Sequence, residues 1–367
     1  SQGYCRAVPE AVDDSELQRQ FSNFSTTSSS RAPLYASLSQ AISRDPELFR
    51  LLLHAPPTQR LPVLLFACVH DVLMGQPDQQ LALWYPNLSK DHRSPTDPLL
   101  IRTFRSFVAT NSERLTHLLA TRSTQTNEVG RCGSLLPALG LLGGEVGPLG
   151  LLDVGTSGGL NLLLDRYEYR YRAPDGSTTQ IGGPSTVTID VDTTGAVPVP
   201  SALPNIVVRC GVDQRPIDVT DDGEARWLEA CVWPDQADRF HRLVAAVDIA
   251  RQHPPQILAG DAVTSLSPGV ERVGAAAHPV VTNSWVLNYL TAHARVAYLR
   301  ELERIGADRD LSWVYAEAPA LIPELPNSPD PKDAHRTVLT MVRWRKGERT
   351  VDHLATVHPH GFWMHWR

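Results

Sequence analysis

The stretch that decides the fold is Leu-Leu-Asp-Val-Gly-Thr-Ser-Gly-Gly-Leu-Asn, residues 151–161. The apolar run from Leu149 to Val154 predicts a buried strand, and the glycines after it predict a turn that leads into a helix. Glycine lets the backbone approach a ligand closely and adopt a positive φ, and the first turn of a helix offers unpaired N–H groups. We therefore expect a strand–turn–helix unit with a ligand site at the turn.

Short apolar runs alternate with helical stretches after this unit, which predicts βαβ units and a mostly parallel sheet. We expect strands at residues 149–154, 206–212, 255–259, 279–283 and 311–317, and an antiparallel pair at 338–345 and 351–358. An insertion of about residues 167–204 separates the first two strands. Two alternating segments within it predict a β-hairpin: Tyr167, Tyr169 and Tyr171, and Val187, Ile189 and Val191.

The chain before the first strand has a different character. Apolar residues repeat at helical spacing from Pro33 to about Gly143. We predict an N-terminal helical domain over residues 1–145, which shapes the acceptor site, and an α/β domain over residues 146–367.

Acidic residues stand at the ends of three expected strands. Asp153 precedes the glycine turn, Asp213 ends the second strand, and Asp261 follows the third. These segments, in this order, resemble the motifs of class I S-adenosylmethionine (SAM)-dependent methyltransferases. The carboxyl ends of parallel strands are also where open α/β sheets bind ligands.

The resemblance implies a Rossmann-like class I methyltransferase sheet that binds SAM, with Asp213 on the ribose and Asp261 and Ala262 at the adenine. A carboxylate suits a diol because it accepts two hydrogen bonds. Ser157 stands where the family has its middle glycine, and the first two motifs are about 50 residues apart, roughly twice the usual gap. The candidate cofactor-binding residues are Asp153, Gly155, Ser157, Gly159, Asn161, Asp213, Asp261, Ala262, Asn283, Trp285, Arg122 and Gln125.

Glu317, His358 and His360 are the candidate catalytic residues, because a carboxylate or an imidazole near the cleft suits proton removal from a hydroxyl. The alternation of the two histidines predicts that both lie on one face of a strand. We expect O-methylation of a small polar acceptor, with aromatic residues near the cleft suited to a saccharide. The Asn-Pro-Pro-Tyr type motif of amino methyltransferases is absent after the fourth strand.

An α/β-hydrolase is the main alternative, because Gly155 to Gly159 also fits the G-x-S-x-G nucleophile elbow. Ser157 would be its nucleophile, with Glu317 or Asp261 as the acid and His358 or His360 as the base. The helical region before the turn and the lack of an HGGG-type segment count against it. An NAD-binding domain and a non-catalytic domain of the same fold are further alternatives.

Composition bounds these readings. The chain has 367 residues and a formal net charge of −6 at pH 7, so we expect no nucleic-acid partner. Its five cysteines form no C-x-x-C pair, which predicts reduced thiols in a cytoplasmic protein and no metal site. No apolar run approaches the ~20 residues that a membrane helix needs, so we expect no membrane segment. The oligomeric state is not predicted.

The whole chain also resembles a bacterial family of uncharacterised proteins with a helical N-terminal part. The segments that carry this resemblance are Gln125–Arg131, Trp227–Asp235 and His358–Gly361. This resemblance supports the fold and implies no activity.

Overall fold

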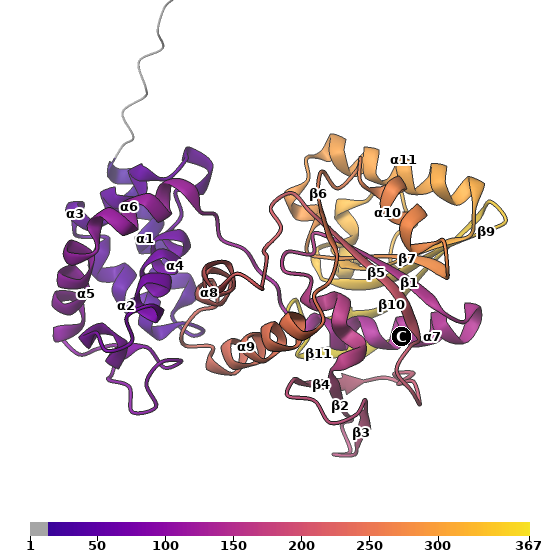
Figure 1. Cartoon of the computed structure of the whole chain (residues 1–367), viewed down its shortest axis with the longest axis horizontal. Helices are drawn as coiled ribbons and strands as arrows, with labels where there is room; N and C mark the ends of the chain where they lie inside the picture. Colours follow the sequence, from indigo (N-terminus) through magenta and orange to yellow (C-terminus); the bar gives the residue numbers. More distant parts are fainter. Residues whose placement is uncertain (1–13) are drawn as a thin grey trace, which may run out of the picture. The chain divides into compact units, whose positions relative to one another are not determined.

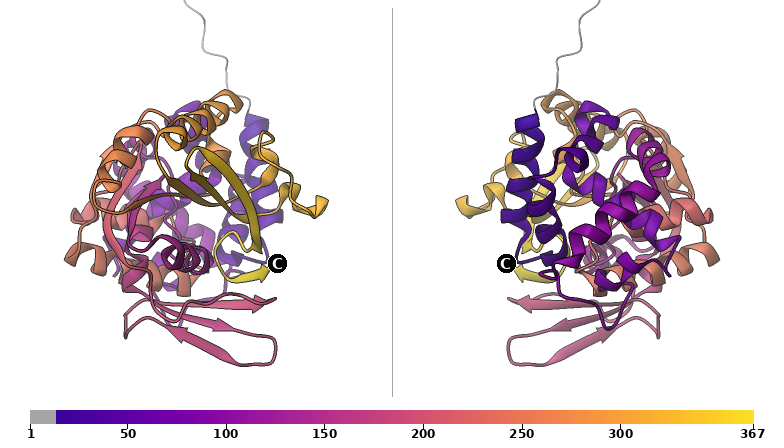
Figure 2. Two further views of the ribbon diagram at one scale, coloured as in Figure 1. Left: turned by 90° about the vertical axis from the view of Figure 1, so that its right-hand side faces the viewer. Right: turned by 90° about the vertical axis from the view of Figure 1, so that its left-hand side faces the viewer.

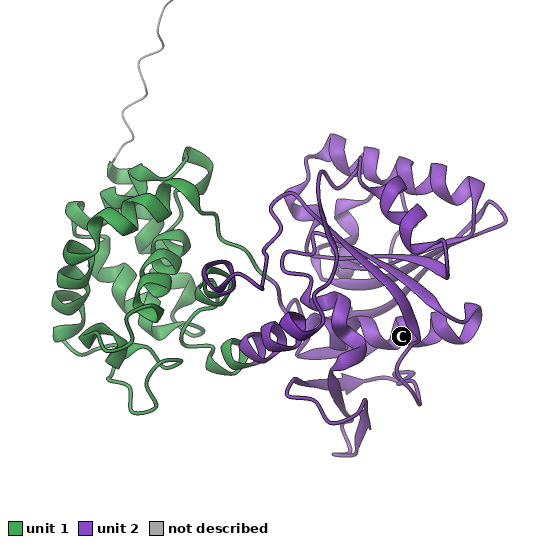
Figure 3. Ribbon diagram, in the orientation of Figure 1, with its two compact units in different colours: residues 1–126, 226–241 green, residues 127–225, 242–367 purple. Residues whose placement is uncertain are grey.

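The computed structural model describes residues 14–367, which form two compact units. The first unit comprises the described residues up to 126 together with residues 226–241, and the second comprises residues 127–225 and 242–367 (Figure 3). The segment 127–145, predicted to belong with the helical region, therefore lies in the second unit.

The first unit is helical, as predicted for this part of the chain. Its central helix α4 (Pro62–Met74) has a proline in its first turn and is buried on almost every side. Two helices in this unit meet at Asn111, whose side-chain amide donates to the Phe107 carbonyl. The other α-helices wholly within this unit are α1 (Asp14–Ser28), α2 (Pro33–Ile42), α3 (Pro46–Phe49), α5 (Leu99–Thr110) and α6 (Ser112–Thr121). Parts of α8 (Asp222–Ala230) and α9 (Ala237–Gln252) also belong to it.

The second unit contains an 11-stranded mixed sheet, so the predicted α/β class is confirmed at that level. Five strands are parallel and follow the order β6-β5-β1-β7-β8. Their bounds agree with the predicted strands to within two residues: β1 (Leu149–Val154), β5 (Ile206–Asp213), β6 (Ile257–Ala259), β7 (His278–Ser284) and β8 (Leu311–Glu317). The strand order reverses between β1 and β7, which is the position where sheets of this kind bind ligands.

An antiparallel section continues the sheet beyond β8. The predicted hairpin is confirmed as β9 (Val338–Arg345) and β10 (Glu348–Val357), and β11 (Trp363–Trp366) pairs with β10.

The insertion is a sheet and not the predicted hairpin. β2 (Glu168–Arg172) pairs antiparallel with β3 (Thr178–Ile181), whereas β4 (Thr188–Thr194), which contains the second alternating segment, runs parallel to β2. β4 also pairs with β11, so the insertion extends the main sheet at its edge (Figure 2). The predicted hairpin was wrong because β4 is positioned by pairing with β11, a strand far along the chain, and that pairing leaves no local pattern in the sequence.

Helices cover both faces of this sheet. α10 (Leu266–Val273) and α11 (Ala292–Asp308) pack on one face, and α7 (Arg131–Val146) lies on the other (Figure 1). Leu152, Val281 and Trp313 belong to the core between the sheet and the α10–α11 layer. On the other face, Gly133 of α7 lets Val191 of β4 approach so closely that a Cβ would not fit.

Within residues 14–367, no helix is both long and apolar enough to cross a membrane. The four described cysteines, Cys68, Cys132, Cys210 and Cys231, are free thiols, and Cys5 lies outside the described residues.

Candidate functional site

The candidate acidic residues of the second unit meet at one edge of the sheet. Asp153 is level with Gly211 of β5 and Thr282 of β7, and Asp213 is level with Ala259 of β6. Glu317 is the last residue of β8. Since β1, β5, β6, β7 and β8 are parallel, their carboxyl ends bring these side chains to the same edge, on both sides of the point where the strand order reverses.

The glycine turn after β1 is held entirely by the protein. The N–H groups of Gly155 and Thr156 donate to the Val212 carbonyl at 2.8 and 3.1 Å. Asn127 Oδ1 accepts from the N–H groups of Gly158 and Leu160 at 3.1 and 3.2 Å. The turn is therefore formed without a ligand, and these N–H groups are not left for a phosphate.

Asp213 closes the same turn from the neighbouring strand. Its Oδ2 accepts from the Ser157 N–H and its Oδ1 from the Arg215 N–H, both at 2.8 Å. A carboxylate has about four acceptor sites, so Asp213 keeps capacity for a ligand hydroxyl. Ser157 has φ +54°, a left-handed conformation that few non-glycine residues adopt.

Asp153 lies beneath the turn and is buried. Its Oδ1 accepts from the Thr282 hydroxyl at 2.8 Å. Burial raises the pKa of Asp153 to about 6, against the effect of that hydrogen bond. The nearby Asp213 raises this pKa further and Arg131 lowers it.

Glu317 is also buried, with 1% of its surface exposed. Its Oε1 accepts from the Asn283 amide at 2.9 Å and from the N–H groups of Val286 and Leu287 at 2.7 and 3.2 Å. No donor in the described part of the chain bonds its Oε2. Burial raises the pKa of Glu317 to about 7, although these three donors lower it.

Asn283 orients Glu317. It is fully buried, and its Oδ1 accepts from Trp313 Nε1 at 2.6 Å and from the Tyr298 hydroxyl at 3.4 Å. These bonds fix which amide atom faces Glu317, so Asn283 acts on a ligand only through that carboxyl group.

The segment after β7 is strained at Trp285, which has φ +59°. A bulky residue in this region is a true outlier, and such outliers concentrate at functional sites. Its indole donates to the Thr337 hydroxyl at 3.2 Å. Val286, next to it, packs on Gly155, where a Cβ would collide with the valine side chain.

Arg131, the first residue of α7, links this edge to the segment after β10. Its Nη1 donates to the Ser284 carbonyl at 3.0 Å and its Nε to the Pro359 carbonyl at 2.9 Å. Its charge lowers the pKa values of both Asp153 and Glu317. A guanidinium group thus stands near the two buried acids.

The candidate histidines lie in a turn, and the prediction that they share one face of a strand was wrong. β10 ends at Val357, and the Gly361 N–H closes the turn by donating to the His358 carbonyl at 2.9 Å. Pro359, His360 and Gly361 lie in the turn between β10 and β11, and Gly361 has a φ of +80° there. His358 Nδ1 accepts from the His360 N–H at 3.0 Å, and His360 Nδ1 lies 3.6 Å from Glu128 Oε2.

The remaining candidates in the second unit have local roles. Asp261 is exposed and its Oδ1 accepts from the N–H groups of Val263 and Thr264 at 2.8 and 3.1 Å. Ala262 is buried in the core, and Asn161 lies 3.5 Å from the Cys132 thiol through its Oδ1.

Two candidates belong to the first unit. The Arg122 guanidinium lies over the Trp227 ring, 5.4 Å from its centroid. Gln125 bonds the Cys231 thiol through its backbone. Both of these contacts are made within the first unit.

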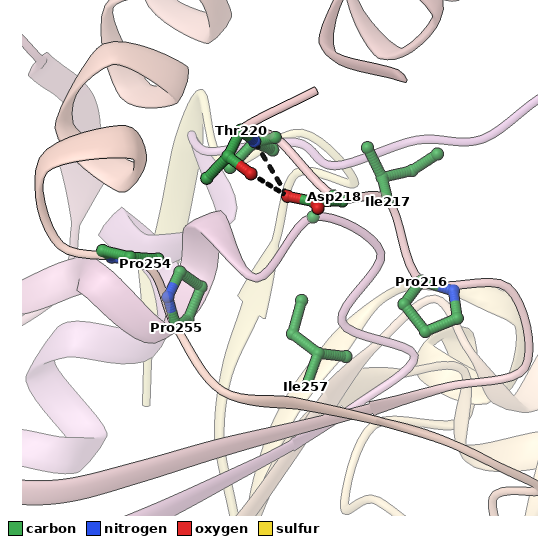
Figure 4. Close-up of a pocket in the computed structure, with 9 residues that line it drawn as sticks. Pro216, Ile217, Asp218, Thr220, Pro254, Pro255 and Ile257 are labelled. Atoms are coloured by element: carbon green, nitrogen blue, oxygen red, sulfur yellow. Dashed lines mark hydrogen bonds between the residues drawn. The ribbon is translucent and has the colours of Figure 1, made fainter. Parts of the chain in front are cut away.

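A pocket of about 230 Å³ opens beside the glycine turn. Figure 4 shows proline and isoleucine side chains around it, with Asp218 and Thr220 hydrogen-bonded to each other at one end at 2.6 Å. Gly158 also borders it. Ligand pockets are usually about 300–1,000 Å³, so this hollow suits a fragment of a ligand rather than a whole cofactor. The described residues contain no cluster of three or more His, Cys, Asp or Glu side chains that could hold a metal ion.

The sequence did not point to Thr282, and it gave Asn127 and Glu128 no role of their own. Only their positions in the chain could have indicated these residues. Thr282 lies near the end of β7, and the other two lie in the polar segment before α7 and β1.

The family model described as "Uncharacterized protein conserved in bacteria (DUF2332)" matches residues 18–366. The chain belongs to this family. The predicted resemblance to an uncharacterised bacterial family is therefore confirmed over nearly the whole chain. No curated protein and no solved structure matches the chain.

Proposed function

We propose that the protein is a SAM-dependent methyltransferase that methylates a hydroxyl group of a small polar acceptor. The observation that carries this proposal is the glycine turn after β1, closed by Asp213 from the adjacent parallel strand. The strand order β6-β5-β1-β7-β8 corresponds to the 3-2-1-4-5 order of doubly wound nucleotide-binding sheets. This order supports the Rossmann-like methyltransferase fold implied by the motifs.

The charge of the edge favours a cationic cofactor. Asp153 and Glu317 are buried acids with raised pKa values, and Glu317 Oε2 has no described donor. Burying a carboxylate is costly unless a cation or hydrogen bonds compensate it. SAM carries a sulfonium and an ammonium group, so its binding would stabilise the ionised acids.

The hydrogen bonds of the glycine turn argue against two alternatives, the NAD-binding domain and the α/β-hydrolase. A pyrophosphate needs open backbone N–H groups at the glycine turn, and here they bond the protein. A hydrolase uses the N–H of the residue after its nucleophile in the oxyanion hole. That N–H belongs to Gly158 and is bonded to Asn127.

The roles of the residues follow from their positions. Asp213 would accept hydrogen bonds from the ribose hydroxyls, and Asp153 and the glycine turn would hold the methionine end of the cofactor. When bound, SAM supplies an electrophilic methyl group, and its sulfur keeps the electron pair of the broken C–S bond. The protein contributes orientation and the removal of a proton.

Calorimetric titration with SAM and S-adenosylhomocysteine tests the proposal. We expect both ligands to bind, and Asp213→Ala to weaken binding at least tenfold, or about 1.4 kcal/mol. Asp175→Ala is the matched control, because Asp175 is an exposed aspartate in the β2–β3 turn. Equal affinities in the wild-type protein and in Asp213→Ala would contradict the ribose assignment.

The hydrolase is kept as a second candidate because the positive φ of Ser157 is what a strained nucleophile elbow would produce. Ser157→Ala should leave SAM affinity nearly unchanged. If the folded protein binds neither ligand, and if it cleaves a p-nitrophenyl ester that Ser157→Ala does not cleave, the hydrolase replaces the methyltransferase.

A further inference from the structure

Glu317 ends β8 with one satisfied and one unsatisfied carboxyl oxygen. Its Oε1 accepts from three donors, the Asn283 amide and the N–H groups of Val286 and Leu287. Its Oε2 is buried, and no donor in the described part of the chain bonds it. A buried anionic oxygen without a hydrogen bond is costly, whereas a neutral hydroxyl in the same place costs far less. The geometry therefore favours a carboxyl group that carries a proton on Oε2.

The charged and titratable groups that act on Glu317 come from three elements. Arg131 of α7 lowers the pKa of Glu317, but by less than burial raises it, and the resulting pKa is about 7. Tyr298 of α11 and Tyr315 of β8 are also buried, and burial raises the pKa of each phenol above its usual value. Both tyrosines therefore stay neutral near pH 7, and Glu317 is the group that changes charge there.

Short paths connect Glu317 to the glycine turn. Val286, whose N–H bonds Glu317 Oε1, packs on Gly155 so closely that a Cβ on the glycine would collide with the valine side chain. Asp153, beneath the turn, accepts from the hydroxyl of the residue before Asn283. Asn283 in turn donates to Glu317. Both buried acids are thus linked to the turn that is proposed to hold the cofactor.

We infer that Glu317 is an exchangeable counter-ion of the cofactor, which is neutral in the protein without ligand and gives up its proton when a cation binds. This inference rests on the proposed methyltransferase function. In the step, the O–H bond at Oε2 breaks, its electron pair stays on the carboxyl group, and the proton leaves to water. The carboxylate then compensates one positive charge of SAM, on its ammonium or its sulfonium group, because a nearby opposite charge favours the ionised form.

The exchange makes Glu317 a specificity-determining residue. An uncharged ligand of similar shape leaves the proton in place and gains no ion pair. The affinity for a cationic ligand therefore rises with pH until Glu317 is already ionised without ligand. We expect the affinity for SAM to rise about fivefold to tenfold between pH 6 and pH 7.

Calorimetric titrations in two buffers with different ionisation enthalpies count the protons that binding releases. At pH 6.5, where an α-ammonium group is charged, we expect about 0.5–1 proton to be released for each SAM bound. Adenosine, which carries no cation, should release none. Release with both SAM and S-adenosylhomocysteine assigns the ammonium to Glu317, and release with SAM alone assigns the sulfonium. No release with SAM, or equal release with adenosine, would overturn the inference.

Glu317→Gln is the matched variant, because glutamine keeps an oxygen for the three donors and resembles the protonated carboxyl group. Proton release should fall by more than half, and the affinity for SAM should change by no more than about twofold between pH 6 and pH 7, as Asp153 alone would cause. Glu324→Gln, at an exposed glutamate after β8, should behave as the wild type. Undiminished release in Glu317→Gln would overturn the role of Glu317.

Infrared difference spectra of the unaltered protein give a second readout that needs no variant. The carbonyl stretch of a protonated carboxyl group should disappear at pH 6.5 when SAM binds. Its persistence in the complex would contradict the exchange, although calorimetry still showed that SAM binds. If neither SAM nor S-adenosylhomocysteine binds the folded protein, the methyltransferase proposal itself fails.

Discussion

The carboxyl edge of the sheet carries two pairs of acids that differ in how the protein satisfies them. The outer pair, Asp213 and Asp261, accepts backbone N–H groups of nearby turns and is partly or fully exposed. The inner pair, Asp153 and Glu317, is buried and has raised pKa values. All four acids lie at or just after the ends of parallel strands, and burial is the main cause of the raised pKa values of the inner pair.

Among variants of these four acids, loss of the Glu317 side chain should lower the free energy of unfolding most. Glu317→Ala leaves the Asn283 amide and two backbone N–H groups buried without an acceptor. We expect the free energy of unfolding in urea to fall by about 3–5 kcal/mol. Glu317→Gln keeps an oxygen for these donors and should lose far less. Equal losses in the two variants would show that the hydrogen bonds to Oε1 contribute little.

The second-largest effect should be a dependence of stability on pH that comes from the inner pair. The folded protein raises the pKa of Glu317 from 4.5 to about 7 and that of Asp153 from 3.8 to about 6. Between these values the folded state binds more protons than the unfolded state, so stability without ligand decreases as pH rises from about 4 to about 7.

Urea titrations at several pH values measure this slope. We expect Glu317→Gln to remove a contribution on the order of 1–3 kcal/mol from it. A wild-type stability that rises over the same range, with no change in slope in Glu317→Gln, would contradict the raised pKa values of the inner pair.

The smallest effect should come from the outer pair. Asp261→Ala removes one acceptor from the N–H groups of Val263 and Thr264, both in an exposed turn. The expected loss of unfolding free energy in urea is about 0.5–1 kcal/mol. A loss comparable to that of Glu317→Ala would remove the distinction between the two pairs.

The sequence predicted the parallel strands well because four of the five are six to eight residues long, and β1 and β8 are buried along their whole length. The sequence also predicted that the candidate acids lie at one edge of the sheet, since this follows from the direction of the parallel strands alone. Short-range patterns suffice for both inferences.

Other features depend on contacts that no local pattern carries. Asn283 reads as a polar residue at a strand end, but Trp313 and Tyr298 turn it towards Glu317. His358 and His360 alternate as in a strand, yet the positive φ of Gly361 places them in a turn. Glu128 Oε2 lies 3.6 Å from His360 Nδ1 although more than half of the chain separates the two residues, and only the folded backbone brings them close.

The pairing of β4 with β11 has a consequence for how the protein is made. Thr194 and His365 are hydrogen-bonded across 171 residues of chain, and closing so long a loop is slow and entropically costly. During synthesis the insertion emerges from the ribosome long before the strand that completes its edge. Until β11 arrives, β4 exposes an unpaired strand edge, which is the kind of surface that chaperones cover and that aggregation exploits.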